Sequence, residues 1–236
     1  MTIGKKTLLL FGASGSIGSA IREKFAQKSW QIVSVKRDEV DSNNQVCWNP
    51  MTETSKQTLD QLRAYGQFDA VCWAQGQNCN DSIYTFDIKQ HREIFEANVV
   101  YILQSLNVLL KENLLSTPAR LCVISSIWQN IARQNKLSYS ISKSALKGLV
   151  LSLANDLGAD GHLINAVLPG ALDTPMTHQN LSVEQIAKIT ASTQFGRLPN
   201  LDDVSNTVHF LCSEENSGVT GQFIKIDLGF SDVRIV

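Results

Sequence analysis

The chain has few of the residues that build metal centres and disulfide frameworks. Its 236 residues include five cysteines and four histidines, with no Cys-x-x-Cys pair and with the histidines far apart. Zinc sites show closely spaced ligands, and disulfide-rich domains pair an even number of cysteines. We therefore expect no metal site. Cys47, Cys72 and Cys122 lie in apolar runs, where we expect them to act as small buried hydrophobic residues.

The sequence also lacks an excess of charge of one sign and a long apolar run. Its 21 Lys and Arg residues balance 22 Asp and Glu residues, for a formal net charge of -1. Proteins that bind nucleic acid usually carry a basic stripe, so we expect no nucleic-acid partner. Neither a signal peptide after Lys5 and Lys6 nor an apolar stretch of membrane-spanning length is evident. We expect a cytoplasmic protein with no membrane partner.

What the chain does contain is a regular alternation of two hydrophobic patterns. Short apolar segments predict strands at residues 7–11, 31–35, 45–48, 70–73, 120–125, 164–168 and 222–226. Segments of helical period predict helices at residues 17–27, 55–65, 94–115, 139–157 and 202–211. Several strands are almost wholly apolar, as in a parallel sheet that is covered on both faces. The pattern predicts an α/β fold in one domain, residues 1–236, with a three-layer, doubly wound parallel sheet of about seven strands.

In such a sheet, ligands bind beyond the carboxyl ends of the strands, so the residues that follow each strand are informative. The segment 171–197 follows a predicted strand and has no clear pattern apart from a short helix at 182–191. Long irregular segments in compact domains often cover a binding site. We expect 171–197 to form a substrate lid.

A glycine-rich turn follows the first predicted strand and opens the first helix. Glycines permit a tight turn and a close approach to a pyrophosphate, and the helix N-terminus offers unpaired N–H groups to the anion. A glycine-rich turn can be purely structural, but at this place in a βαβ unit we expect it to bind a dinucleotide. The candidate contacts are Gly12, Ser14, Gly15, Ser16, Ile17 and Gly18.

Two cations, Lys36 and Arg37, follow the second predicted strand. A carboxylate at this place would bond the ribose 2′-hydroxyl of NAD and repel a 2′-phosphate. A guanidinium can bind the phosphate through two hydrogen bonds, and an ammonium adds charge. A solvated basic turn is the alternative. We expect NADP(H) as the cofactor in preference to NAD(H).

Tyr139 and Lys143 lie four residues apart in a predicted helix and therefore share a face. A tyrosine has an ordinary pKa of about 10, and a nearby cation favours the phenolate. Lys143 is expected to move the pKa of Tyr139 toward neutrality. Ser126 follows the preceding strand, close enough in sequence for its hydroxyl to reach the phenol, although a capping role is the alternative. Together Ser126 and Tyr139 can bind one carbonyl oxygen.

The conjunction of these motifs resembles the shorter, single-domain branch of the short-chain dehydrogenase/reductase family over essentially the whole chain. The resemblance implies a Rossmann-type fold and a catalytic set of Asn98, Ser126, Tyr139 and Lys143. In that family, the asparagine holds a water that links the lysine to solvent, and the lysine also holds the nicotinamide ribose. The resemblance also implies a homotetramer or dimer, built partly from helices 94–115 and 139–157. Its further cofactor contacts here are Ala74, Gly76, Tyr139, Lys143, Pro169, Gly170 and Thr174.

Three motifs depart from the family pattern, one of them the usual Asp-Gly-Gly near the end, which is Asp227-Leu228-Gly229 here. The glycine turn is spaced Gly-x-x-Gly-x-x-Gly, as in the family's longer branch, and the usual Asn-Asn-Ala-Gly is Trp73-Ala74-Gln75-Gly76. The expected function is NADP(H)-dependent interconversion of a carbonyl and an alcohol by hydride transfer, with Tyr139 as acid and base. The alternatives are a non-catalytic dinucleotide sensor and an epimerase or dehydratase. The substrate is expected to be a small molecule whose identity the sequence leaves open.

Overall fold

A computed structural model describes residues 5–37 and 43–233, within which seven parallel strands form one sheet. Its strand order is β3-β2-β1-β4-β5-β6-β7. The order reverses between β1 and β4, which creates a crevice at their carboxyl ends. The strands are β1 (Thr7–Phe11), β2 (Gln31–Lys36), β3 (Gln45–Cys47), β4 (Phe68–Trp73), β5 (Leu115–Ile124), β6 (Leu163–Pro169) and β7 (Phe223–Ile226).

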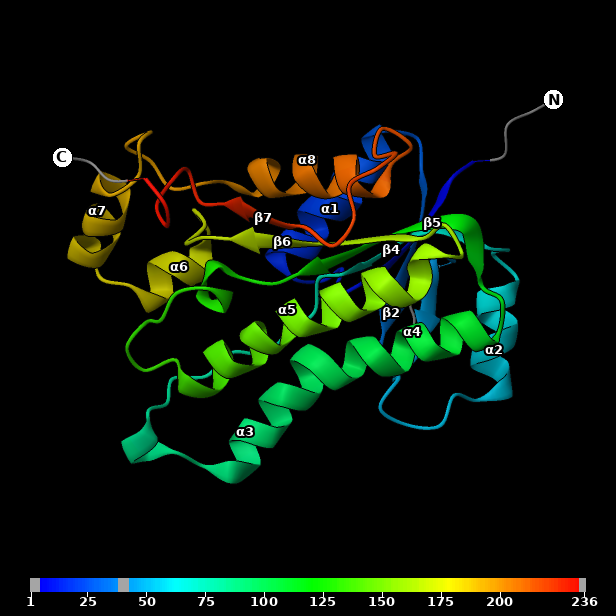
Figure 1. The fold of residues 1–236 in the computed structure, drawn as a ribbon, viewed down its shortest axis with the longest axis horizontal. Helices are drawn as coiled ribbons and strands as arrows, with labels where there is room; N and C mark the ends of the chain where they lie inside the picture. The colour runs from blue at the N-terminus through cyan, green and yellow to red at the C-terminus, as the bar shows by residue number, and fades with distance from the viewer. Residues whose placement is uncertain (1–4, 38–42, 234–236) are drawn as a thin grey trace.

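Helices cover both faces of the sheet (Figure 1). One face carries α1 (Ser16–Gln27) and α8 (Leu201–Cys212), and the other carries α4 (Tyr101–Lys111) and α5 (Leu137–Gly158). The prediction of a three-layer, doubly wound parallel sheet is confirmed. The shorter elements are α2 (Lys56–Arg63), η1 (Ile83–Thr85), α3 (Ile88–Phe95), the π turn η2 (Glu96–Val100), η3 (Ile127–Gln129), α6 (Pro175–Asn180) and α7 (Val183–Ala191).

The apolar strands supply two core layers, one on each face of the sheet. In β1, Leu9 and Phe11 face one layer, while Leu8 and Leu10 face the other, and all four side chains are fully buried. Burial on both faces explains why β1 lacks the polar alternation of a half-exposed strand.

Aromatic rings fill the core layer where β1 and β4 end. Phe11 packs on Trp48, Trp73 and Tyr101 with ring centroids 5.6, 5.9 and 5.7 Å apart. The indole N–H of Trp73 donates to Ser105 Oγ at 2.8 Å, so the buried ring keeps a polar partner. This cluster supports the strand ends from which the glycine turn and Gly76 emerge.

The prediction of a helix at 94–115 was wrong at both ends. The helix begins at Ile88, where Asp87 accepts a hydrogen bond from Gln90 N at 2.7 Å, and it ends at Lys111. Asn113 has a φ of 53°, which ends the helical path before β5 starts at Leu115. Apolar residues resume at Leu114 and Leu115 after this turn, so periodicity alone placed the turn and the first strand residue in the helix.

The helical stretch Ile88–Lys111 is long and apolar enough to cross a membrane by length and composition. In this fold, however, Ile102, Leu106 and Leu109 are buried against the sheet. Its apolar face thus serves the core of the domain.

Candidate active site

A cleft of about 940 Å³ opens at the carboxyl ends of β1, β2 and β4. This volume lies within the range of small-molecule and cofactor sites. Ser16, Ile17 and Gly18 form the first turn of α1, and the cleft wall includes seven residues that the sequence predicted: Gly12, Ser14, Gly15, Lys36, Arg37, Ala74 and Gly76.

The glycine turn has the close packing that its residues were predicted to allow. Gly12 has a φ of +75°, and a Cβ there would lie 2.5 Å from Gln75 N. A Cβ on Gly18 would lie 2.1 Å from the Gly12 carbonyl oxygen. Helix α1 then begins at Ser16, and its N-cap residue Gly15 offers no side-chain cap. Its first N–H groups are suited to an anion at the floor of the cleft.

The cleft wall also includes residues to which the sequence analysis gave no role in binding, among them Arg22, Gln75, Glu93, Glu96 and Tyr101. Both polar atoms of the Gln75 side chain are buried without a hydrogen-bond partner in the structure. Such a group costs free energy unless a ligand or water satisfies it. Burial raises the pKa of Tyr101 to about 12, while the positive charge of Arg37 lowers it. A dinucleotide could bond the unpaired Gln75 amide, and its phosphates could bind the uncapped N-terminus of α1 and the cations of the cleft wall.

Tyr139 and Lys143 lie on one face of α5, beside the end of β5. The Lys143 Nζ is 5.7 Å from the centroid of the Tyr139 ring and donates to the Ile124 carbonyl oxygen at 3.0 Å. Lys143 is only 5% exposed, and this burial lowers its pKa to about 8. The structure thus brings the predicted phenol and ammonium together.

The electrostatics of Tyr139 differ from the sequence expectation. Burial raises the pKa of the phenol, and a side-chain hydrogen bond with Ser126 lowers it by less. The predicted shift toward neutrality is therefore not found, because desolvation of the phenolate outweighs its stabilisation. Ser126 also accepts from Trp128 N at 3.3 Å, so the alternative capping role and the contact with Tyr139 coexist.

Asn98 lies in the π turn η2, and it is 1% exposed. Its Nδ2 donates to the Gln77 carbonyl oxygen at 3.0 Å and to Ser142 Oγ at 2.9 Å, while its Oδ1 accepts from Gln77 N at 2.8 Å. A Cβ on Gly76 would lie 2.9 Å from this Oδ1 and 3.7 Å from the Lys143 Nζ. Asn98 therefore joins the loop after β4 to α5, and the absence of a side chain on Gly76 leaves room for both groups.

The predicted contacts after β6 are not among the residues that line this cleft. Pro169 ends β6, and a Cβ on Gly170 would lie 2.9 Å from Asp227 Cβ. The Thr174 hydroxyl caps α6 by accepting from Thr177 N at 3.3 Å. The predicted lid 171–197 contains α6 and also α7, which agrees with the predicted short helix at 182–191.

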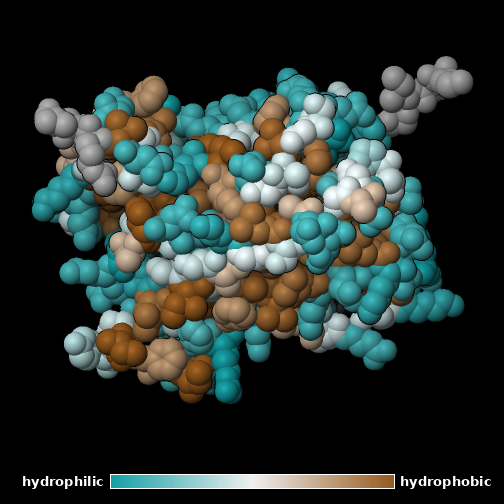
Figure 2. Space-filling model, in the orientation of Figure 1, coloured by the Kyte–Doolittle hydropathy of each residue, from teal (hydrophilic) through white to brown (hydrophobic). Residues whose placement is uncertain are grey.

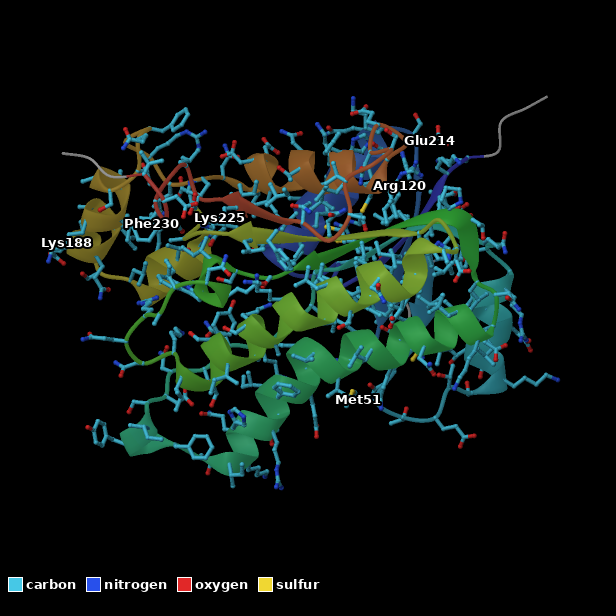
Figure 3. All side chains as sticks on the ribbon, viewed as in Figure 1. Met51, Arg120, Lys188, Glu214, Lys225 and Phe230 are labelled. Carbon is cyan, nitrogen blue, oxygen red and sulfur yellow. The ribbon has the colours of Figure 1, made fainter. Side chains whose placement is uncertain are left out.

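Figure 3 shows at which end of the sheet the segment 171–197 lies. Lys188 of α7 and Phe230 lie at the end near α6, whereas Arg120 and Glu214 lie toward the opposite end. The segment 171–197, predicted as a lid, and Phe230 after β7 thus both lie at the end of the molecule where α5 begins (Figures 1 and 3).

The fold and the cleft together define a doubly wound α/β protein with a site of cofactor size. A family model described as enoyl-(acyl carrier protein) reductase matches residues 12–231. The chain belongs to the short-chain dehydrogenase/reductase family, as the sequence predicted.

Relatives and solved structures are similar along nearly the whole chain. The 3-oxoacyl-[acyl-carrier-protein] reductase FabG of Escherichia coli K12 is 25% identical, with 97% of this chain and 98% of that protein covered. An uncharacterized oxidoreductase of Bacillus subtilis, YmfI, is also 25% identical, over 95% of this chain and 98% of its own. A gluconate 5-dehydrogenase from Burkholderia cenocepacia, solved with NADP and tartrate, has a TM-score of 0.88 at 17% identity, with 97% and 96% covered. The ligand-free aldohexose dehydrogenase of Thermoplasma acidophilum has a TM-score of 0.83 at 22% identity, with 98% and 96% covered.

Proposed function

We propose that this protein is an NADP(H)-dependent oxidoreductase that interconverts a carbonyl and an alcohol, with Tyr139 as the proton-transferring residue. The observation that carries the proposal is the pair formed by the half-buried Tyr139 and the buried Lys143, 5.7 Å from ring centroid to Nζ, on the helix that follows β5. This pair lies next to Gly76, which lines the dinucleotide-sized cleft. Proton transfer and cofactor binding would thus take place side by side.

When bound, the nicotinamide supplies or accepts the hydride at the substrate carbon. In the direction of reduction, the Tyr139 hydroxyl donates its proton to the carbonyl oxygen, and the Ser126 hydroxyl donates a hydrogen bond to the same oxygen. The protonated Lys143 then stabilises the phenolate that Tyr139 becomes. Asn98 keeps Gln77 and Ser142 in place around these groups.

The titration behaviour of Tyr139 favours reduction over oxidation at neutral pH. Because burial raises its pKa, the phenol holds its proton and is ready to act as the acid. Oxidation would need the phenolate as base, which is scarce under these conditions. We expect reduction to be the faster direction near neutral pH and oxidation to gain as the pH rises.

The substrate class is tested by a panel of carbonyl compounds with NADPH. The panel should include 3-oxoacyl thioesters, because relatives are named as 3-oxoacyl-[acyl-carrier-protein] reductases. It should also include sugars and sugar acids, because structural neighbours are named as gluconate and aldohexose dehydrogenases. NADPH oxidation that depends on an added carbonyl supports the proposal. NADPH binding without turnover supports a sensor, and substrate conversion without net NADPH oxidation supports an epimerase or dehydratase.

The role of Tyr139 is tested by replacing it with phenylalanine. Tyr139→Phe should remove nearly all turnover, because the proton donor is lost, while NADPH affinity measured by fluorescence changes little. Tyr84→Phe is the matched control, since Tyr84 is 95% exposed on η1. Full activity in Tyr139→Phe would overturn the assigned role.

We propose that Arg37, with Lys36 and Arg22, selects the 2′-phosphate of NADP. All three line the cleft at or near the glycine turn and the end of β2, while Glu93 and Glu96 enter it from α3 and η2. A charge-assisted contact contributes about 1.5–3 kcal/mol, so Arg37→Ala should lower kcat/KM for NADPH roughly 10-fold or more. The value for NADH should change little. The control Arg63→Ala removes surface ion pairs with Asp60 and Glu112, away from the cleft. Equal use of NADH and NADPH by the wild type would contradict the preference.

We also propose a homo-oligomer that uses the outer faces of α4 and α5. Leu103, Ile141 and Leu151 are 44%, 43% and 48% exposed on these helices, and Figure 2 shows apolar surface across this face. Burial of such a surface stabilises association. Light scattering should give a mass above one chain, and Leu151→Glu should lower it. A monomer at micromolar concentration would refute this arrangement.

A further inference from the structure

Tyr139 has a second cation over its ring besides Lys143. The Lys136 Nζ lies 5.9 Å from the ring centroid, and the Lys143 Nζ lies 5.7 Å from it. Lys136 precedes α5 and is 8% exposed, so water screens its charge weakly. By distance and burial, the two ammonium groups are nearly equivalent neighbours of the phenol.

The ammonium of Lys136 is held by neutral groups only. It donates to Asn78 Oδ1 at 2.9 Å, to the Cys79 carbonyl oxygen at 3.1 Å and to Asn80 Oδ1 at 2.6 Å. Within residues 5–37 and 43–233, no carboxylate lies within 4.0 Å of its Nζ. A buried cation without a paired anion favours a negative charge on a nearby group.

The other titratable groups near the phenol each have a partner of their own. Asp81 accepts hydrogen bonds from Ser138 N at 3.0 and 3.2 Å, and His91 Nδ1 lies 2.9 Å from Ser138 Oγ. The Cys79 thiol donates to Asp81, and Arg133 lies over the Trp128 ring at 6.0 Å. Asp81 weakens the effect of Lys136 on the phenol, whereas Arg133 adds to the positive charge.

We propose that Lys136 acts on Tyr139 as a second positioning cation, which shares with Lys143 the stabilisation of the ionised phenol. This inference rests on the proposed role of Tyr139 as acid and base. The three amide and carbonyl oxygens fix the ammonium at a distance from which its charge reaches the ring without a direct bond. The protein thereby offsets part of the desolvation of a phenolate formed during turnover.

If this is so, the charge at residue 136 should have a measurable effect on the pKa of the Tyr139 phenol. Two unit charges about 6 Å apart, at an effective dielectric constant of about 20, interact by roughly two pKa units. Removal of the Lys136 charge should therefore raise the pKa of the phenol by about one to two units. Removal of the exposed Lys147, on the same helix, should change it little.

The test follows the phenol itself, so it needs neither substrate nor turnover. Difluorotyrosine, a more acidic analogue, replaces Tyr139, and fluorine NMR then reports this one side chain while the protein is folded. The backgrounds are wild type, Lys136→Met, Lys136→Arg, Asn80→Ala and Lys147→Met, each checked by circular dichroism. Lys136→Gln replaces Lys136→Met if the methionine variant does not fold.

The expected result separates charge from structure. Lys136→Met raises the pKa of the phenol, whereas Lys136→Arg and Lys147→Met leave it within about half a unit of wild type. Asn80→Ala removes one of the three oxygens that hold the ammonium but keeps its charge, so its shift should be smaller than that of Lys136→Met. A shift below half a unit in Lys136→Met, or an equal shift in Asn80→Ala, would overturn the proposal. The activity of Tyr139→Phe decides the proposed function separately, because the coupling can exist in an inactive protein.

Discussion

Gly76 lies between the cofactor cleft and the proton-transfer residues, and Gly76→Ala should impair both activity and stability. The new Cβ would lie 2.9 Å from Asn98 Oδ1, although such contacts are ordinarily at least 3.4 Å. Asn98 would have to move by about half an ångström, which lengthens its 2.8 Å hydrogen bond from Gln77 N. The Asn98 amide is 1% exposed and makes three hydrogen bonds, so a movement that relieves the contact weakens them.

The expected cost follows from these contacts. Overpacking of a buried site costs about 1–3 kcal/mol of the free energy of unfolding. A displacement approaching 1 Å near reacting groups can lower the rate about 100-fold, so we expect a loss of roughly 10- to 100-fold in kcat/KM for Gly76→Ala. Urea unfolding followed by circular dichroism measures the first quantity. NADPH oxidation with the best carbonyl of the panel measures the second.

Gly158→Ala is the matched control, because it makes the same chemical change where nothing lies within 4 Å of the new Cβ. Gly158 is the last residue of α5, so alanine should leave activity unchanged and add a few tenths of a kcal/mol to the free energy of unfolding. Wild-type stability and activity in Gly76→Ala would refute the steric reasoning.

Three further predictions concern buried polar groups. Ser105→Ala leaves the Trp73 indole N–H without its partner at 2.8 Å and should cost about 1–3 kcal/mol in urea unfolding. His162 accepts from Ala119 N at 2.9 Å, and burial lowers its pKa, so stability should fall as the pH drops below about 6.5 and through the folded-state value. Gln75→Ala should weaken NADPH binding roughly 5- to 10-fold in a fluorescence titration, because the amide then cannot bond the cofactor.

Each of these has a control and a contrary outcome. Thr52→Ala, on the exposed surface, controls for Ser105→Ala, and a cost below about 0.5 kcal/mol would contradict the buried bond. His162→Gln should lose part of the acid slope, and an unchanged slope would assign it to other groups such as His209, whose pKa is also lowered by burial. Unchanged NADPH affinity with higher stability in Gln75→Ala would mean that the amide only adds strain.

The sequence by itself determined the architecture and the principal candidates for the site. Apolar strands that alternate with amphipathic helices admit few packings, and a parallel sheet covered on both faces is the one that buries them. The glycine turn could be predicted because its close contacts are local. They join residues that are near one another along the chain or at adjacent strand ends. Tyr139 and Lys143 share a helix face, so their proximity follows from helical geometry alone.

Only the tertiary structure decided the electrostatics and the cross-chain contacts of the site. Burial raises the pKa of Tyr139 against the sequence expectation, because desolvation depends on all the elements that enclose the ring. The Asn78–Asn80 loop holds Lys136 near the phenol across more than fifty residues of sequence, and the orphaned amide of Gln75 is evident only once its surroundings are known. Periodicity records which face of an element is apolar, whereas charge stabilisation depends on distance and solvent exclusion, and these are properties of the folded chain.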